Sequence, residues 1–194
     1  MPRLLTPHLA PGSLAERDQP DITADDITLR PWRLADAADV TGAFTDSAIR
    51  VWHARSMDEG EAEAWIASWR KRWNDEADAG WAITGAGGLL GQISLRHIAL
   101  EEGIASISYW VLPAARGRRV APRALTALTG WAFGTLGLHR LQLEHSTAND
   151  ASCRVAVKAG FPAEGTRRGG ALHADGHHDM HLHARLATDP SPDA

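Results

Sequence analysis

Cysteine is almost absent from this sequence of 194 residues, in which Cys153 is the single thiol. One thiol excludes a disulfide within the chain and fits a reducing compartment. Long apolar runs are missing too, so no segment is suited to cross a membrane. The first residues also lack the charged-then-apolar order of a signal peptide. These absences predict a cytoplasmic protein that does not act in a membrane.

The chain also lacks an excess of positive charge. It has 20 Lys and Arg against 24 Asp and Glu, a net charge of -4, which argues against general binding of nucleic acid. A content of 44% hydrophobic and 23% charged residues is typical of one globular domain. Residues 1–26 and 188–194 show no sustained period, and we expect two loose tails around a single domain at 27–187.

Strand-like and helix-like segments are mixed along this domain. Apolar patterns predict strands at 27–32, 105–112, 140–146 and 179–186, and a hairpin at 81–98 around the glycine-rich turn 85–88. Helical spacing with suitable ends predicts helices at 34–44, 59–73, 149–160 and from about 120 to 136. This order predicts an α/β (α+β) fold in which helices cover a mixed sheet.

An arginine-rich loop joins a predicted strand to the next helix. Four arginines stand around one glycine there: Arg116, Arg118, Arg119 and Arg123 around Gly117. Pro122 fits only the first helical turn, so the helix should begin near Val120 or Ala121. Such a turn presents backbone N–H groups to a phosphate, and Gly117 allows close approach. A solvated basic turn explains the local pattern equally well.

The segment from Tyr109 to Phe161 resembles the central half of the Gcn5-related N-acetyltransferases (GNAT), and most of all their ribosomal-protein alanine acetyltransferase (Rim) branch. The stretches "LRPWRLADAADV" and "DGHHDMHLHARL" are also similar to that branch. Residues 116–121 stand at the family's R-G-x-G-x-A/G loop, with Arg119 in place of a second glycine. Asn149 and Ser152, followed by "KAGF", match a second signature. The resemblance implies a GNAT fold, whose sheet splays into a V between helices on both faces.

The resemblance also implies which residues bind acetyl-CoA. The backbone of Trp110, Val111 and Leu112 would bind pantetheine as an added strand does. N–H groups along the loop would hold the pyrophosphate, at Arg116, Gly117, Arg118, Arg119, Val120 and Ala121. Asn149 would contact the cofactor, and Ser152 would donate a proton to the leaving sulfur. Capping their own helix is the alternative role for Asn149 and Ser152.

The catalytic base is where the sequence departs from the Rim pattern. A glutamate is expected after "AEGT", but Ala171 stands at the matching position. The strand 140–146 offers Glu144 and His145, which face opposite sides of a sheet. His145 has the more suitable pKa, which burial with Leu141 and Leu143 would lower. We predict that His145 is the base; packing with those leucines is its alternative role, and Glu144 or solvent would then take the proton.

Other conspicuous residues receive plainer interpretations. Trp65, Trp69 and Trp73 form a helical stripe typical of a core, although the resemblance implies that Trp69 or Trp73 contacts substrate. Five histidines lie between His173 and His183, but no cysteine accompanies them and their spacing matches no zinc motif, so we expect no metal. Cys153 shows no basic partner that would make it a nucleophile.

Together these observations predict an acetyl-CoA-dependent N-acetyltransferase, in which a primary amine attacks the thioester directly. The acceptor is either a protein N-terminus or a small-molecule amine. The resemblance further implies that two chains pair as a homodimer. The alternative is a domain that binds acyl-CoA without turnover and regulates a partner.

Overall fold

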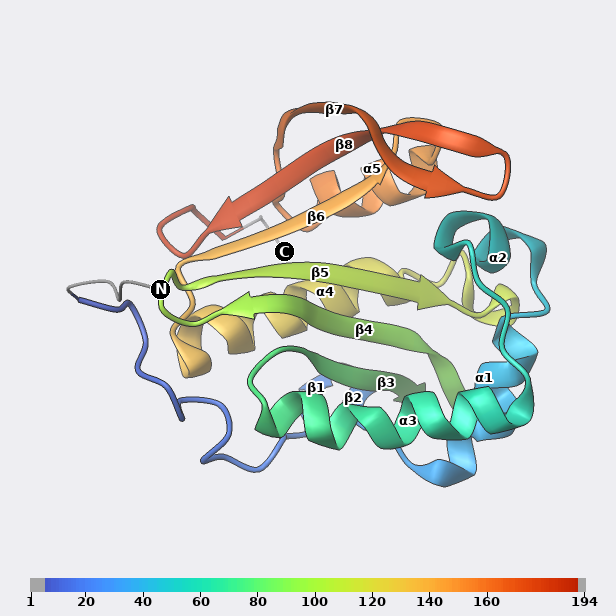
Figure 1. Cartoon of the computed structure of the whole chain (residues 1–194), viewed down its shortest axis with the longest axis horizontal. Coiled ribbons are helices and arrows are strands. Elements are labelled where there is room, and N and C mark those ends of the chain that lie inside the picture. Colours follow the sequence, from blue (N-terminus) through green and yellow to red (C-terminus); the bar gives the residue numbers. More distant parts are fainter. Residues whose placement is uncertain (1–5, 192–194) are drawn as a thin grey trace.

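A single mixed sheet forms the centre of the molecule in the computed structural model, which describes residues 6–191. Its order is β1-β2-β3-β4-β5-β6-β8-β7, and every neighbouring pair is antiparallel except β5 and β6 (Figure 1). The strands are β1 (Ile22–Ala24), β2 (Ile27–Pro31), β3 (Ala79–Gly85), β4 (Gly88–Ala99), β5 (Ile104–Val111), β6 (Arg140–Ser146), β7 (Ala163–His173) and β8 (Gly176–Leu186). The predicted mixed sheet is confirmed.

Helices cover both faces of this sheet. In Figure 1, α3 lies in front of the lower strands, whereas α4 and α5 lie behind the sheet. The α-helices are α1 (Ala37–Ala43), α2 (Ser47–His53), α3 (Glu59–Asn74), α4 (Val120–Trp131) and α5 (Asp150–Lys158); 3-10 helices occur at Leu34–Asp36 and Pro113–Ala115, and a π-helical segment, Ala132–Leu136, follows α4. Among the described residues, no helix combines the length and the apolar character that a membrane crossing requires.

The local sequence explains where helix α3 begins and ends and which of its faces is buried. Asp58 and Glu61 form a reciprocal capping box at its start, and basic side chains occupy its last turn. Trp69 and Trp73 face the sheet and are 2% and 4% exposed. A Cβ on Gly80 would lie 2.5 Å from the Trp69 ring, so this indole packs directly on the backbone of β3. Neither tryptophan lines the cavity described below, so the structure gives no support to the prediction that Trp69 or Trp73 contacts substrate.

The N-terminal segment is bound to the domain, contrary to the prediction of a loose tail at 1–26. Within the described part, Leu14 is fully buried. The backbone N–H groups of Gly12, Leu14 and Ala15 donate to the Glu76 carboxylate, at 2.7 to 3.0 Å. Two buried indoles donate to carbonyls of this segment: Trp73 to Arg17 and Trp81 to Pro20. Backbone groups hold the segment, which explains why its side chains show no period.

Strands β5 and β6 diverge along their length. Their parallel pairing runs from Ile104↔Arg140 to Ile107↔Leu143, although β5 continues to Val111 and β6 to Ser146. The two ribbons separate toward α2 in Figure 1. The predicted V-shaped splay is therefore confirmed. It leaves one side of the outer half of β5 without a partner strand.

Candidate active site

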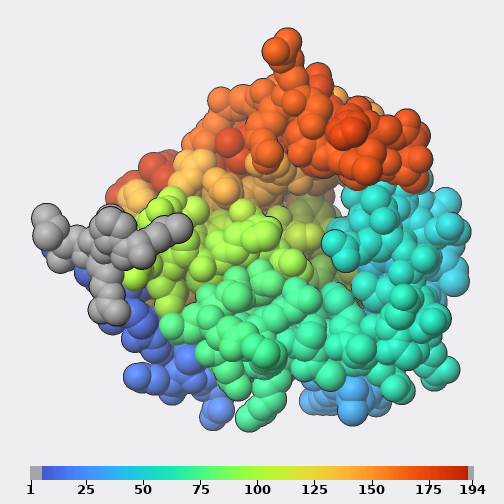
Figure 2. Space-filling view, viewed as in Figure 1, coloured from blue at the N-terminus to red at the C-terminus, as the bar shows by residue number. Residues whose placement is uncertain are grey.

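The diverging strands enclose a cavity of about 660 Å³. Figure 2 shows the hollow between the orange β7–β8 region, the teal α2 segment and the green strands. Its lining comes from seven helices and strands and the loop before α4, and it includes Tyr109 and Val111 on β5, Val120 on α4, Ser146 on β6, Ser152 on α5, His53 on α2, His173 on β7 and Met180 on β8. Segments that are far apart in the sequence therefore meet at the splay.

The predicted phosphate loop forms one end of the cavity. Gly117 has a φ of +76°, and a Cβ placed there would meet no atom within 4 Å. Arg119 precedes α4 with a φ of 57°, the left-handed conformation that glycine adopts without strain. The departure from the family pattern at Arg119 thus keeps the backbone shape that a glycine would give. Val120 and Ala121, at the start of α4, line the cavity.

The arginines of this loop divide into two pairs. Arg116 binds the Asp46 carboxylate at 2.5 Å, and this hydrogen bond lowers the pKa of Asp46. Arg123 forms an ion pair with Asp26. Arg118 and Arg119 are exposed and make no ion pair with residues 6–191. Half of the basic cluster is thus neutralised within the fold, and the other half is free to face a polyanion.

Across the gap between the strands, Ser152 meets a tyrosine. The Ser152 hydroxyl lies 2.7 Å from the Tyr109 hydroxyl, whereas Asn149 caps α5 by accepting the Ser152 N–H. Capping, the alternative role, is therefore observed for Asn149 but not for the Ser152 side chain. Burial raises the pKa of Tyr109 to about 12, so its hydroxyl stays protonated at neutral pH. Tyr109 was missed, although it is the chain's single tyrosine.

The side chain of His145 is occupied within the protein. Its Nδ1 donates to the Ser146 carbonyl at 2.8 Å, and its Nε2 lies 3.1 Å from Nε2 of His183. Burial lowers its pKa, in the direction that the sequence predicted. Glu144 also borders the cavity, but Arg167 binds both of its carboxylate oxygens. The alternative interpretation of His145, packing with a bond to a carbonyl, matches the observed contacts.

A different histidine that lines the cavity has a nitrogen without a partner. His173 on β7 donates its Nδ1–H to the Val51 carbonyl at 3.1 Å, so its Nε2 carries a lone pair. That Nε2 is buried and has no hydrogen-bond partner among residues 6–191. His173 lies two residues after Ala171 on β7, hence on the same face of the strand. The sequence pattern did not identify His173 as a base.

His173 and His53 also border a second, more open cavity of about 860 Å³ on the other side of α2. Its remaining lining comes from α2, the loop after it and the end of β7, and includes Arg50, Arg55 and Leu172. The two histidines therefore stand where two spaces adjoin. Helix α2 forms this boundary, and the sequence pattern did not predict that helix.

The titration of His53 makes the stability of the domain depend on pH. Burial lowers its pKa from 6.5 to about 4, so the unfolded chain binds this proton more tightly than the folded chain. The stability contribution is complete above pH 6.5 and is lost as the pH falls toward 4. We expect His53 to account for a loss of about 2 kcal/mol between pH 7 and pH 5. Urea unfolding of wild type and His53→Gln at both pH values measures it; equal losses would contradict the assignment.

The prediction that no cysteine accompanies the histidines was wrong. Cys153 on α5 lies beside His145, His181 and His183, with its Sγ 4.0 Å from Nε2 of His183. The spacing along the chain does not reveal this cluster, because its residues come from three separate elements: β6, α5 and β8.

Comparisons with known proteins agree with this architecture. The acetyltransferase (GNAT) domain family matches residues 26–162. YdaF of Bacillus subtilis (strain 168), provisionally named a ribosomal N-acetyltransferase, is 30% identical over 125 residues, which cover 64% of this chain and 68% of YdaF.

Solved structures show the same fold. A crystal structure titled as a probable acetyltransferase is 25% identical, with a TM-score of 0.80 over 86% of this chain and 96% of the other. Mycobacterium smegmatis RimJ, solved with CoA-disulfide, gives a TM-score of 0.81 at 21% identity, covering 89% of this chain and 90% of RimJ. The chain therefore belongs to the GNAT acetyltransferase family, as an acetyl-CoA-dependent N-acetyltransferase.

Proposed function

We propose that this enzyme transfers the acetyl group of acetyl-CoA to a primary amine by direct attack. The observation that carries the proposal is the splay itself. It brings the N–H groups at the start of α4, the unpaired side of β5 and the Ser152–Tyr109 pair into one cavity. The first suits a pyrophosphate, the second pantetheine amides and the third a leaving thiolate.

The backbone of β5 refines which residues would bind pantetheine. The Leu112 N–H already donates to the Leu90 carbonyl of β4 at 2.9 Å. Because backbone groups alternate sides along a strand, those of Trp110 point toward β4 as well, and those of Tyr109 and Val111 point into the gap. Of the three residues that the resemblance implied, Val111 is the one suited to the cofactor. Tyr109 replaces the other two.

Proton transfer at the sulfur falls to the Ser152–Tyr109 pair. When the amine nitrogen bonds to the carbonyl carbon, a tetrahedral oxyanion forms, and its collapse breaks the carbon–sulfur bond. Ser152 gives its proton to the thiolate, and Tyr109, protonated at neutral pH, passes a proton to Ser152 through their 2.7 Å hydrogen bond as it takes one up from solvent. Asn149 positions Ser152 by capping α5.

We assign removal of the amine proton to His173. A general base needs a lone pair that faces the substrate. His145 lines the cavity, but its Nδ1 is bonded to the Ser146 carbonyl and its Nε2 faces His183, and His53, with a pKa of about 4, is a weak base for an amine. His173 borders both cavities, and its buried Nε2 has no hydrogen-bond partner among residues 6–191, so a turn of the ring would offer its lone pair to the amine. It thus takes the role that the sequence analysis gave to His145.

The second cavity supplies the route for the acceptor. It is open and lies outside α2, so an amine on a long chain can reach His173 while the cofactor fills the first cavity. The name of YdaF points in the same direction, toward a ribosomal protein as acceptor. We therefore propose the α-amino group of a protein N-terminus, with small-molecule amines as the competing class.

Release of CoA thiol across a panel of amines tests this function. We expect release with peptides that carry a free N-terminus, little release with small amines, and none with N-terminally blocked peptides. Ser152→Ala should bind acetyl-CoA normally but release thiol more slowly, which separates catalysis from binding. Acetyl-CoA binding without release across the whole panel would support the non-catalytic alternative.

A further inference from the structure

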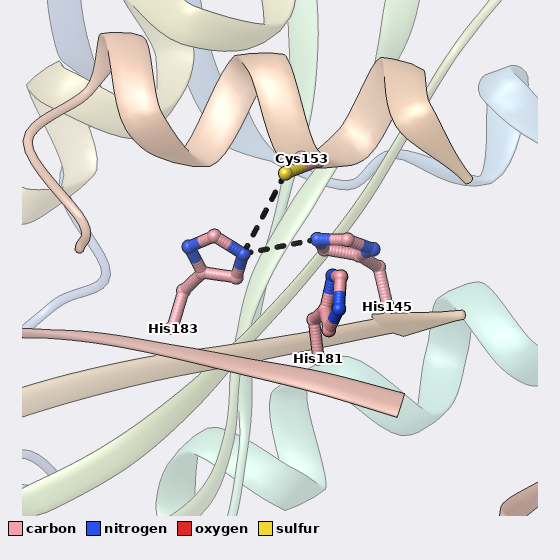
Figure 3. A group of neighbouring side chains, drawn as sticks. All are labelled: His145, Cys153, His181 and His183. Atoms are coloured by element: carbon pink, nitrogen blue, oxygen red, sulfur yellow. Dashed lines mark hydrogen bonds between the residues drawn. The ribbon is translucent and has the colours of Figure 1, made fainter. Parts of the chain in front are cut away.

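A cluster of three imidazoles and a thiol lies behind the wall of the active site. His145 on β6 is the cross-strand partner of His181 on β8, so their side chains share one face of the sheet. His183, two residues along β8, points to the same face. Helix α5 covers that face and directs Cys153 toward the three rings, as Figure 3 shows.

Hydrogen bonds to backbone carbonyls set the tautomers of two of these rings. His145 donates its Nδ1–H to the Ser146 carbonyl, and His183 donates its Nδ1–H to the Phe161 carbonyl at 2.9 Å. A carbonyl only accepts, so each Nδ1 holds the proton and each Nε2 presents a lone pair. The same arrangement, in which one nitrogen is anchored by an outer partner, orients histidine ligands in metal sites.

The two lone pairs face each other without a donor between them. The Nε2 atoms of His145 and His183 are 3.1 Å apart, and His183 is fully buried. Two acceptors at this distance repel unless a cation lies between them. A shared proton would join these two rings alone, leaving His181 and Cys153, whose ligand atoms lie within 4.8 Å of the others, without a role.

The distances suit a tetrahedral ion. With Zn–N of about 2.0–2.1 Å and Zn–S of about 2.3 Å, tetrahedral ligands are separated by about 3.4 Å for N···N and about 3.6 Å for N···S. The corresponding separations are 3.1 Å between the two Nε2 atoms and 4.0 Å from Cys153 Sγ to His183 Nε2. The largest separation between any two of the four ligand atoms is within 4.8 Å. Bringing such a pair to the tetrahedral distance requires a movement of about 1 Å, which side-chain rotation can supply.

We infer that His145, Cys153, His181 and His183 bind a zinc ion. Nitrogen and sulfur donors in tetrahedral array favour zinc, and four protein ligands leave no open position, as in structural sites. The ion joins β6, β8 and α5 at residues adjacent to the active site: His145 precedes Ser146, and Cys153 follows Ser152. Zinc would therefore hold together the two walls on which these serines lie.

Cobalt titration of the chelator-treated full chain tests this site, without acetyl-CoA or amine. We expect one Co²⁺ per chain, with a thiolate-to-cobalt charge-transfer band and the intense visible bands of a four-coordinate ion, both lost when zinc is added. At a thousandfold excess of free zinc over its Kd, the Tm should rise by about 8–16 °C.

Cys153→Ser is the decisive variant because its side chain is partly exposed and the change is small. It should keep the Tm of the metal-free wild type but lose the charge-transfer band and most of the zinc-induced shift. His177→Gln, an exposed histidine of the same segment, should behave as wild type. Absence of tight binding, or equal binding by Cys153→Ser, would overturn the proposal. Neither outcome depends on whether the enzyme transfers acetyl groups.

Discussion

We expect Gly117→Asp to raise the dissociation constant for acetyl-CoA about 10²- to 10³-fold. Gly117 lies in the left-handed region beside open space at the start of α4. A carboxylate there would stand near the proposed pyrophosphate, and two like charges about 4 Å apart at an effective dielectric constant near 20 repel by about 4 kcal/mol. Isothermal titration with acetyl-CoA measures the effect.

Two variants separate charge from backbone strain at this loop. Gly117→Asn has the shape of aspartate without its charge, and asparagine tolerates a positive φ, so it should weaken binding far less. Arg119→Gly should have a small effect, because Arg119 already holds the conformation that glycine prefers. Normal affinity in Gly117→Asp, or an equal loss in Gly117→Asn, would exclude an anion at this position.

His173→Gln should lower kcat by about 10²- to 10⁴-fold, the usual contribution of a general base. Glutamine keeps a hydrogen-bonding side chain but cannot take up a proton. Acetyl-CoA affinity should change little, because His173 also borders the second cavity, the proposed route of the acceptor. Steady-state kinetics with the best peptide of the panel, together with calorimetry, separate these quantities.

A pH series distinguishes a base from a structural histidine. Above the pKa of the amine, about 8 for a protein N-terminus, the substrate is already deprotonated, so the deficit of His173→Gln should shrink. His177→Gln serves as the exposed control. If His145→Gln or Glu144→Gln shows the loss instead, and His173→Gln retains full kcat, the base is the residue that those variants identify.

Prediction from the sequence succeeded where a segment buries one face. The strand 140–146 was predicted at its observed bounds because Leu141 and Leu143 alternate with polar residues. It failed for β7, whose side chains are mostly exposed and which is interrupted by two register shifts. This edge strand forms through backbone pairing with β8, and its sequence lacks the alternation of apolar and polar residues by which strands were predicted. The short helix α2 was missed as well, although Asp46 caps it.

The residues of the candidate site also differ in how far the sequence could predict them. The loop around Gly117 and Ser152 were placed at the site from contiguous motifs, and both line the cavity; their roles stay predictions. His173 and the cluster around Cys153 could not be predicted, because they depend on which strands pair and which helix covers them. The cross-strand pair His145↔His181 joins positions 36 residues apart. No spacing rule along the chain encodes that register.

The splay between β5 and β6 also has a consequence for self-association. A row of unpaired backbone groups normally occurs at the rim of a sheet, where it can recruit the strand of another molecule and start aggregation. In this protein the row lies in the middle of the sheet, flanked by β4 and β6 and approached past α2. A second polypeptide would have to pass between two strands that remain joined at their other ends. The unpaired side of β5 is therefore accessible to a narrow ligand, whereas the strand of another chain cannot pair with it.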